Sequence, residues 1–250
     1  MSRIVCWFSC GAASAVATKM IVEEHKRLGQ GKEIVIAYTE VKQEHEDNKR
    51  FLRDCEQWFG IPITVLQNER YKGDIYEVFI RTGYLVGPTG AACTRLLKKS
   101  VRKDFEKPTD TQVFGFTVEE QARYNSFLDA NNIDCRVPLI EHGLTKQDCL
   151  GVLAKAGIEI PAMYKLGYSN NNCIGCVKGG AGYWNKIRVD FPETFETMAQ
   201  IEDLMGRTIV KHKGERISLR NLPPDAGRDQ PEPNFDCGVV CYAAFKQLEE

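Results

Sequence analysis

Strand-like and helix-like segments alternate along the first 156 residues of this chain. Each short apolar run typical of a β-strand is followed by a longer stretch with helical periodicity. The expected strands are residues 4–8, 33–38, 63–66, 112–116 and 135–138. The expected helices are residues 13–28, 45–59, 94–105, 118–131 and 145–156. This order predicts an α/β fold with a parallel five-stranded sheet, right-handed crossovers and helices on both faces.

The alternation stops at residue 157. Residues 167–182 are rich in Asn, Gly and Cys, a helix is expected over residues 192–205, and residues 222–234 form a proline-rich connector. We therefore expect two parts: an α/β domain at residues 1–156 and a loop-rich, cysteine-containing C-terminal lobe at residues 157–250 packed on it. Ligation or docking is expected to hold this lobe more than a core of its own.

Charge and hydropathy indicate a soluble, cytoplasmic protein without a membrane association. The net charge of −1 gives no overall field that would recruit nucleic acid or an anionic membrane. No apolar run is long enough to span a bilayer, and the N-terminus lacks the pattern of a signal peptide. Local basic clusters, such as Lys211, Lys213, Arg216 and Arg220, are more often solvated faces than binding patches.

The segment from Ser9 to Ser14 joins the first expected strand to its helix. Backbone N–H groups at a helix start attract anions, and the small residues here let a phosphate approach closely. The two serine hydroxyls can donate further hydrogen bonds to phosphate oxygens. A phosphate cradle and an ordinary strand–turn–helix connection are both compatible with this spacing.

Ten cysteines are many for a protein of a reducing compartment. Cys6, Cys55, Cys135 and Cys149 lie in or beside apolar segments, where packing explains them. Cys173 and Cys176 form a C-x-x-C pair in an expected loop, a spacing that suits ligation of one metal or cluster. A redox dithiol has the same spacing but is normally found at a helix start that follows a strand.

One pair of thiolates does not complete a metal site. Cys237 and Cys241 would supply two further ligands for a four-cysteine zinc site, whereas Cys93 would supply one for an iron–sulfur cluster. Spacing alone does not choose between these completions.

Several segments, in order, resemble the phosphoadenylyl-sulfate (PAPS) reductase family of the PP-loop, or adenine nucleotide alpha hydrolase-like, superfamily. The superfamily motif Ser-Gly-Gly-x-Asp-Ser is matched by both serines and one glycine of residues 9–14, and further matches extend to about residue 205. The resemblance implies a Rossmann-like fold that binds an adenine nucleotide. The residues that it assigns to the nucleotide are Ser9, Cys10, Gly11, Ala12, Ala13, Ser14, Tyr38, Thr39, Gly115 and Arg123.

The iron–sulfur reductases of this family hold a [4Fe-4S] cluster with a Cys-Cys pair about eighty residues before their C-x-x-C. Here Cys93 precedes Cys173 by 80 residues, but Ala92 stands in place of the first cysteine of the pair. The resemblance therefore implies three ligands: Cys93, Cys173 and Cys176. An incomplete ligand set leaves one iron open to sulfide or substrate, or to closure by Cys237 or Cys241.

The resemblance leads to three candidate functions, of which two are enzymatic and one is not. The first is ATP-dependent adenylation and sulfur transfer, with a nucleic-acid acceptor, a sulfur donor and Mg²⁺ as candidate participants. The second is reduction of an adenylyl sulfate with Cys237 as nucleophile, Cys241 as a resolving thiol and a thioredoxin-like reductant. The third is a degenerate nucleotide-binding module with a structural zinc or cluster. A homodimer is a candidate assembly for all three.

Overall fold

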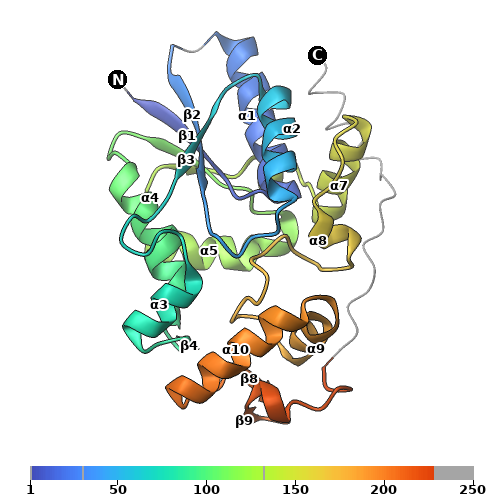
Figure 1. The fold of residues 1–250 in the computed structure, drawn as a ribbon. Coiled ribbons are helices and arrows are strands. Elements are labelled where there is room, and N and C mark those ends of the chain that lie inside the picture. The colour runs from blue at the N-terminus through green and yellow to red at the C-terminus, as the bar shows by residue number, and fades with distance from the viewer. Residues whose placement is uncertain (1, 30, 132, 228–250) are drawn as a thin grey trace.

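The computed structural model describes residues 2–29, 31–131 and 133–227. Five parallel strands form one sheet in the order β3-β2-β1-β6-β7 (Figure 1). The strands are β1 (Arg3–Phe8), β2 (Glu33–Thr39), β3 (Ile63–Leu66), β6 (Thr111–Val113) and β7 (Cys135–Arg136). The predicted five-stranded parallel α/β sheet, Rossmann-like in arrangement, is confirmed.

Helices cover both faces of this sheet, as predicted. The helices of its α/β layers are α1 (Ala12–Leu28), α2 (Asn48–Phe59), α4 (Ser100–Phe105), α5 (Gln121–Ala130), α6 (Pro138–Glu141) and α7 (Lys146–Lys155). Side chains of β1 alternate between the faces, since successive residues of a strand point to opposite sides. Ile4, Cys6 and Phe8 pack with α1, α2 and α7, whereas the Trp7 ring lies edge-on to Phe105 of α4.

Element ends differ from the expected ones for local reasons. The expected strand 112–116 pairs only to Val113, and the chain after it turns toward α5. The strand expected to reach residue 138 ends at Arg136, because Pro138 lacks an N–H and begins α6. The helix expected over residues 94–105 starts as a π-helix, η1 (Thr94–Lys99), and a 3₁₀ turn, η2 (Val118–Glu120), precedes α5.

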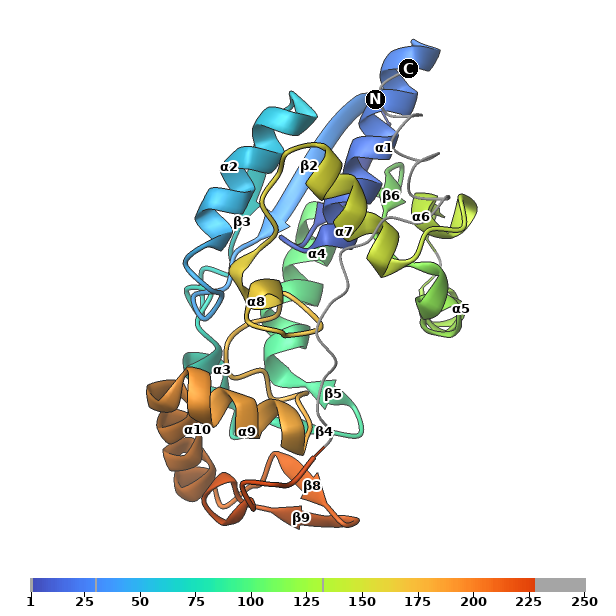
Figure 2. The same cartoon turned by 90° about the vertical axis from the view of Figure 1, so that its right-hand side faces the viewer.

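The remaining elements lie below the sheet in Figures 1 and 2. Helix α3 (Ile75–Thr82) was not expected; the Asp74 side chain accepts a hydrogen bond from Tyr76 N at its start, and Gly83 ends it with a φ of 62°. The C-terminal part contains α8 (Ala162–Lys165), α9 (Ala181–Asp190), α10 (Pro192–Met205), the turn η3 (Leu219–Asn221) and the hairpin of β8 (Val210–His212) and β9 (Glu215–Ile217). A second hairpin joins β4 (Val86–Gly87) to β5 (Gly90–Ala91).

A second hydrophobic core holds the C-terminal part. Trp184 of α9 and Met198 of α10 are fully buried in it, together with Phe79 of α3 and Leu97 of η1. This core is shared between residues 41–97 and residues 163–226, so the C-terminal part docks on residues 41–97 through apolar side chains. Among the described residues, no helix is long and apolar enough to cross a membrane.

Candidate functional site

The loop of residues 9–14 lies at the carboxyl end of β1, where the strand order reverses. Strands β2 and β3 follow on one side of β1, and β6 crosses to the other side. Open parallel sheets bind ligands at this point, in the crevice beyond the strand ends. The N-cap residue of α1 is Gly11, which has no side chain to cap the helix, and the first turn carries no acidic residue. The helix start therefore presents a positive dipole end, with N–H groups that its N-cap residue does not satisfy.

The serine hydroxyls close the loop on itself. Ser14 Oγ accepts hydrogen bonds from Ser9 N and Ser9 Oγ, both at 3.1 Å, and donates to Gly11 O at 3.0 Å. The Tyr164 hydroxyl accepts from Ala12 N at 3.4 Å, and burial raises the pKa of this tyrosine to about 12. A neutral phenol that accepts a hydrogen bond from Ala12 N can also donate a hydrogen bond from its O–H to an anionic oxygen.

Cys10 contributes its backbone to the loop while its thiol is a packing group. Its φ is 58°, in the left-handed region that a glycine adopts more easily. The side chain is fully buried, Sγ lies 3.6 Å from Asn48 O, and burial raises the pKa of the thiol. The positive φ at this position is the conformation that the glycine of the superfamily motif would supply.

Gly115, directly beyond β6, lies against the same loop. A Cβ atom at this position would be 2.7 Å from both N and Cα of Ser14, so only glycine fits. Thr39 ends β2, on the opposite side of β1 from β6 in the sheet order, and is half-buried. Arg123 does not join this group: it lies on α5 with a side chain 73% exposed, in an ion pair with Glu120. Among the expected nucleotide-binding residues, Arg123 therefore lies apart from the loop's contacts.

Tyr38 leads from the sheet to a buried carboxylate. Its hydroxyl donates to Glu44 Oε2 at 2.5 Å, and burial together with the Glu44 charge raises the pKa of Tyr38. Glu44 also accepts from Asn48 Nδ2 at 2.9 Å and pairs with Lys98 Nζ at 3.3 Å. The Tyr38 hydroxyl is thus hydrogen-bonded to Glu44. Lys98, which pairs with Glu44, also lies near the cysteines.

The three cysteines expected to ligate a metal come together beside Lys98. Burial lowers the pKa of Lys98, but the neighbouring Cys173 and Glu44 charges outweigh it and raise the pKa overall. Burial raises the pKa of Cys173 to about 12, and Lys98 opposes this shift. Cys93, at the start of η1, lies within electrostatic range of both Cys173 and Cys176. Three soft ligands beside a cation suit a thiolate-bound group.

The C-x-x-C loop is held by its backbone. Ile174 N donates to Gln43 O at 2.8 Å, while the Tyr183 hydroxyl donates to Cys173 O at 3.1 Å and accepts from Cys176 N at 2.9 Å. Gly175 has a φ of 76°, and a Cβ there would be 2.7 Å from Thr194 Cγ2. These contacts fix the two thiols on one short loop.

No group of three or more His, Cys, Asp or Glu side chains within residues 2–29, 31–131 and 133–227 is spaced to hold a single metal ion. Cys237 and Cys241, expected as catalytic or ligating thiols, lie outside the described residues.

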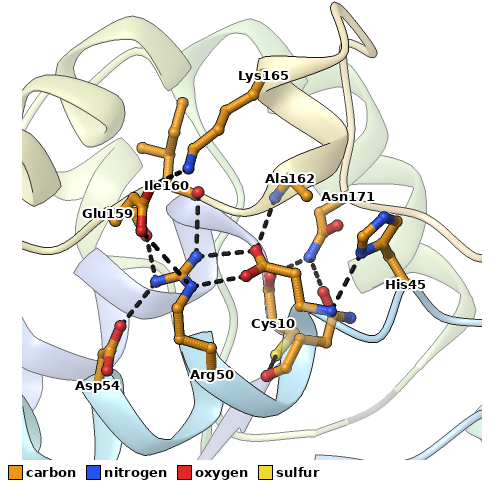
Figure 3. A network of polar contacts seen from close by, with 11 residues as sticks. Cys10, His45, Arg50, Asp54, Glu159, Ile160, Ala162, Lys165 and Asn171 are labelled. Atoms are coloured by element: carbon orange, nitrogen blue, oxygen red, sulfur yellow. Dashed lines mark hydrogen bonds and ion pairs between the residues drawn. The ribbon is translucent and has the colours of Figure 1, made fainter.

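A polar network joins the 9–14 loop to the segment that carries the C-x-x-C (Figure 3). Arg50 of α2 binds both oxygens of Asp47, at 2.6 and 2.8 Å, and donates to Ile160 O at 3.2 Å. Asp47 Oδ2 accepts from Ala162 N, at the start of α8. Asn171 Nδ2 donates to Cys10 O at 2.6 Å (Figure 3).

Asn171 also carries an unused acceptor. Its Nδ2 is shared between Cys10 O and Asn48 Oδ1, whereas its buried Oδ1 has no hydrogen-bond partner among the described residues. An orphaned buried acceptor is unfavourable unless a water or a ligand donates to it. No sequence motif indicated Asn171 or Lys98, because Asn171 bonds to Cys10 and Lys98 to Glu44, both distant in the chain.

Comparison with known proteins identifies no family for this chain. No protein-family model matches the chain, and no curated protein matches it either.

Proposed function

We propose that this chain is a PAPS reductase-like enzyme of the PP-loop superfamily, with the adenine nucleotide alpha hydrolase-like form of the α/β fold. It would bind ATP on the 9–14 loop and carry out adenylation followed by sulfur transfer. The observation that supports this most is the start of α1 at the strand-order reversal, where the N-cap residue is a glycine without a capping side chain and the backbone of Gly115 packs against Ser14. Such a site favours an anion in contact with the main chain.

Adenylation activates an acceptor that otherwise has a poor leaving group. An acceptor oxygen attacks the α-phosphorus of ATP, the bond to the β-phosphate oxygen breaks, and pyrophosphate leaves with the electron pair. N–H groups in the first turn of α1, such as that of Ala13, would stabilise the charge on the departing phosphates. A hydrosulfide from the sulfur donor then attacks the activated carbon, and AMP leaves with the oxygen.

Cys93, Cys173 and Cys176 would hold a [4Fe-4S] cluster, which supplies an iron coordination position for sulfur when bound. Lys98 lies beside these thiols, and its ammonium offsets their negative charge once they are deprotonated. The Asn171 contact with Cys10 connects their loop to the nucleotide loop. Both sites would therefore keep a fixed relative position during turnover.

ATP binding tests the nucleotide site. In isothermal titration calorimetry we expect Ser14→Ala to weaken ATP binding at least tenfold, because it removes the hydroxyl that closes the loop. Ser126→Ala is the matched control, since Ser126 lies on exposed α5 and donates only to Ala122 O of its own helix. Equal ATP affinity in wild type and Ser14→Ala would contradict this site.

Turnover tests the reaction. Pyrophosphate release from ATP that requires an added nucleic-acid acceptor supports the proposal. Thioredoxin-dependent release of sulfite from an adenylyl sulfate would assign the reductase activity instead. Substitution of Cys237, the nucleophile in that reaction, should then abolish sulfite release. Inactivity in both assays together with nucleotide binding would indicate a non-enzymatic nucleotide-binding module.

Metal content tests the thiol site. After anaerobic purification we expect iron and sulfide in the wild type and their loss in Cys93→Ala. Cys135→Ala is the matched control, because Cys135 is also a half-buried free cysteine but lies at β7. Zinc in place of iron would contradict the cluster.

A further inference from the structure

We propose that the β8–β9 hairpin is a binding arm for the phosphate backbone of a nucleic acid. It lies at the end of the molecule farthest from the parallel sheet (Figures 1 and 2). The inference deepens the proposed function by naming the surface that would hold its nucleic-acid acceptor, and it rests on that function only for the reaction carried out on the acceptor. Binding by the hairpin can be measured without nucleotide or turnover.

Cationic side chains are concentrated on this hairpin although the whole chain is nearly neutral. Residues 207–216 contain four lysines and arginines and one carboxylate, while the chain as a whole has a net charge of −1. Arg207, Lys211, Lys213 and Arg216 are all exposed. In the part of the chain that the structure describes, none of these four takes part in an ion pair, so their charges are not locally neutralised.

Two of these cations stand opposite each other in the hairpin. The register pairs Lys211 directly with Arg216, and like charges at such positions destabilise a two-stranded ribbon. A hairpin selected only for stability would have an opposite-charge or apolar pair here. An anionic partner that neutralises both residues removes this repulsion.

The tip of the hairpin also has a lysine where stability favours another residue. Lys213 and Gly214 have φ values of 49° and 87°, as a type I′ turn requires. Asn, Asp or Gly is preferred at the first of these positions, because a lysine side chain disfavours positive φ. The charge at the tip is therefore retained against the local conformational preference.

The base of the hairpin is rigid. The buried carboxylate of Glu202, on α10, accepts from Ile209 N and from Leu219 N, both at 2.6 Å, and so clamps both ends of the hairpin. Arg216 Nη1 donates to Thr208 O and Ile209 O, which fixes the return strand. The hairpin backbone is thus ordered before binding, so that only the cationic side chains are immobilised when an anion binds.

The arrangement suits a nucleic acid better than a membrane. The exposed side chains of the tip, at residues 211–216, are charged, and no exposed apolar or aromatic side chain is present there to enter a lipid interface. Lys211 and Arg216 lie directly opposite each other on the two strands, with Cβ atoms about 5 Å apart, so that their long side chains can contact neighbouring phosphates. Lys213, in the turn, extends this cationic row to the tip of the hairpin.

The test measures binding of a fluorescein-labelled, mixed-sequence single-stranded RNA of 20 nucleotides by fluorescence anisotropy, without ATP, from 50 to 200 mM KCl. For the double variant Lys211→Gln/Lys213→Gln we expect about tenfold weaker binding. The slope of log K against log salt should become shallower by about 1.4, the loss of two contacts to a single strand. Lys32→Gln/Lys103→Gln is the matched control, since both lysines are exposed elsewhere on the chain.

A second variant separates charge from folding. Asn is favoured at the first position of a type I′ turn, so Lys213→Asn should raise the melting temperature while still weakening RNA binding. Unchanged RNA affinity in the double variant, or no RNA binding by the wild type at 50 mM KCl, would overturn the inference. So would hairpin-dependent binding to phosphatidylserine vesicles without binding to RNA, which would assign the arm to a membrane surface. If the wild type binds RNA but releases no pyrophosphate from ATP, the result would count against the proposed function alone.

Discussion

Gly115 touches the backbone of Ser14: a Cβ atom built on Gly115 would lie 2.7 Å from Ser14 N and from Ser14 Cα. The two residues follow different strands, β6 and β1, which are adjacent in the sheet. Their contact holds the chain after β6 against the start of α1, because a larger residue at position 115 would force the two apart.

Gly115→Ala tests this contact. Close-packed atoms at 2.7 Å must move apart, so we expect the start of α1 to shift and ATP affinity to fall at least tenfold. Overpacking of this kind destabilises by about 1–3 kcal/mol, which thermal unfolding will register. Gly31→Ala is the control, because its Cβ would meet no atom within 4 Å and its backbone conformation is not restricted to glycine. ATP affinity in Gly115→Ala equal to that of the control would contradict the close approach.

Asp47 and Arg50 predict a dependence of stability on pH. Hydrogen bonds from Arg50, opposed by burial and supported by Ala162 N, lower the pKa of Asp47 in the folded protein. A lowered folded pKa means that the carboxylate stabilises the fold above the usual pKa of an aspartate and loses this effect as pH falls through the folded value. We expect Asp47→Asn to reduce the free energy of unfolding at pH 7 by about 2 kcal/mol.

Urea unfolding at a series of pH values from 7 to 3 measures this effect. The difference between wild type and Asp47→Asn should shrink toward the acid end of the series. Asp54→Asn removes one contact to the same arginine from a more exposed carboxyl and should have a smaller effect. A difference that stays constant from pH 7 to pH 3 would be inconsistent with the Asp47 pKa shift.

The buried ion pair of Arg3 and Asp110 joins the start of β1 to the turn before β6. Arg3 Nη2 lies 2.6 Å from Asp110 Oδ2, and the Asp110 side chain is completely buried. Asp110→Asn leaves the Arg3 charge without compensation, and we expect a loss of about 3–5 kcal/mol in the free energy of unfolding. The double variant Arg3→Met/Asp110→Leu should recover most of this loss. Failure of the double variant to recover would show that the pair is needed for packing rather than for charge balance.

Glu202 predicts local protection at the hairpin base. Replacing it with glutamine leaves one of the two N–H donors facing an amide NH₂ group, so amide hydrogen exchange at Ile209 or Leu219 should accelerate at least tenfold. Glu193→Gln, on the exposed side of the same helix, is the control. Unchanged exchange at both amides would mean that the hairpin is held by its apolar contacts.

The sequence predicted the main sheet because the pattern that defines it is local. Strand β3 and helix α10 have the predicted bounds, and β1 and α1 differ from them by one residue at one end. Helix α9 was missed because its start follows a glycine-rich loop, and its burial depends on α10 and β8 rather than on its own periodicity. The β8–β9 hairpin was missed because its strands have three residues each.

The candidate site likewise has parts that could be predicted from the sequence and parts that could not. The 9–14 loop and the C-x-x-C are continuous in sequence and could be predicted, whereas Asn171 reaches Cys10 across 161 residues and Lys98 reaches Glu44 across 54. Contacts of this separation are created by the strand order. Arg123 was assigned by motif position alone, and its ion pair with Glu120 shows that position in a motif does not fix the direction of an exposed side chain.

The strand order also determines when the site can form during synthesis. Strand β1 leaves the ribosome first and becomes the central strand, and β2 and β3 can pair beside it once residue 66 has emerged. Its other edge stays unpaired until β6 appears some 45 residues later, and Gly115 arrives with that strand. Until then the nascent chain has β1 unpaired on that side, and the start of α1 lacks the glycine that packs against Ser14.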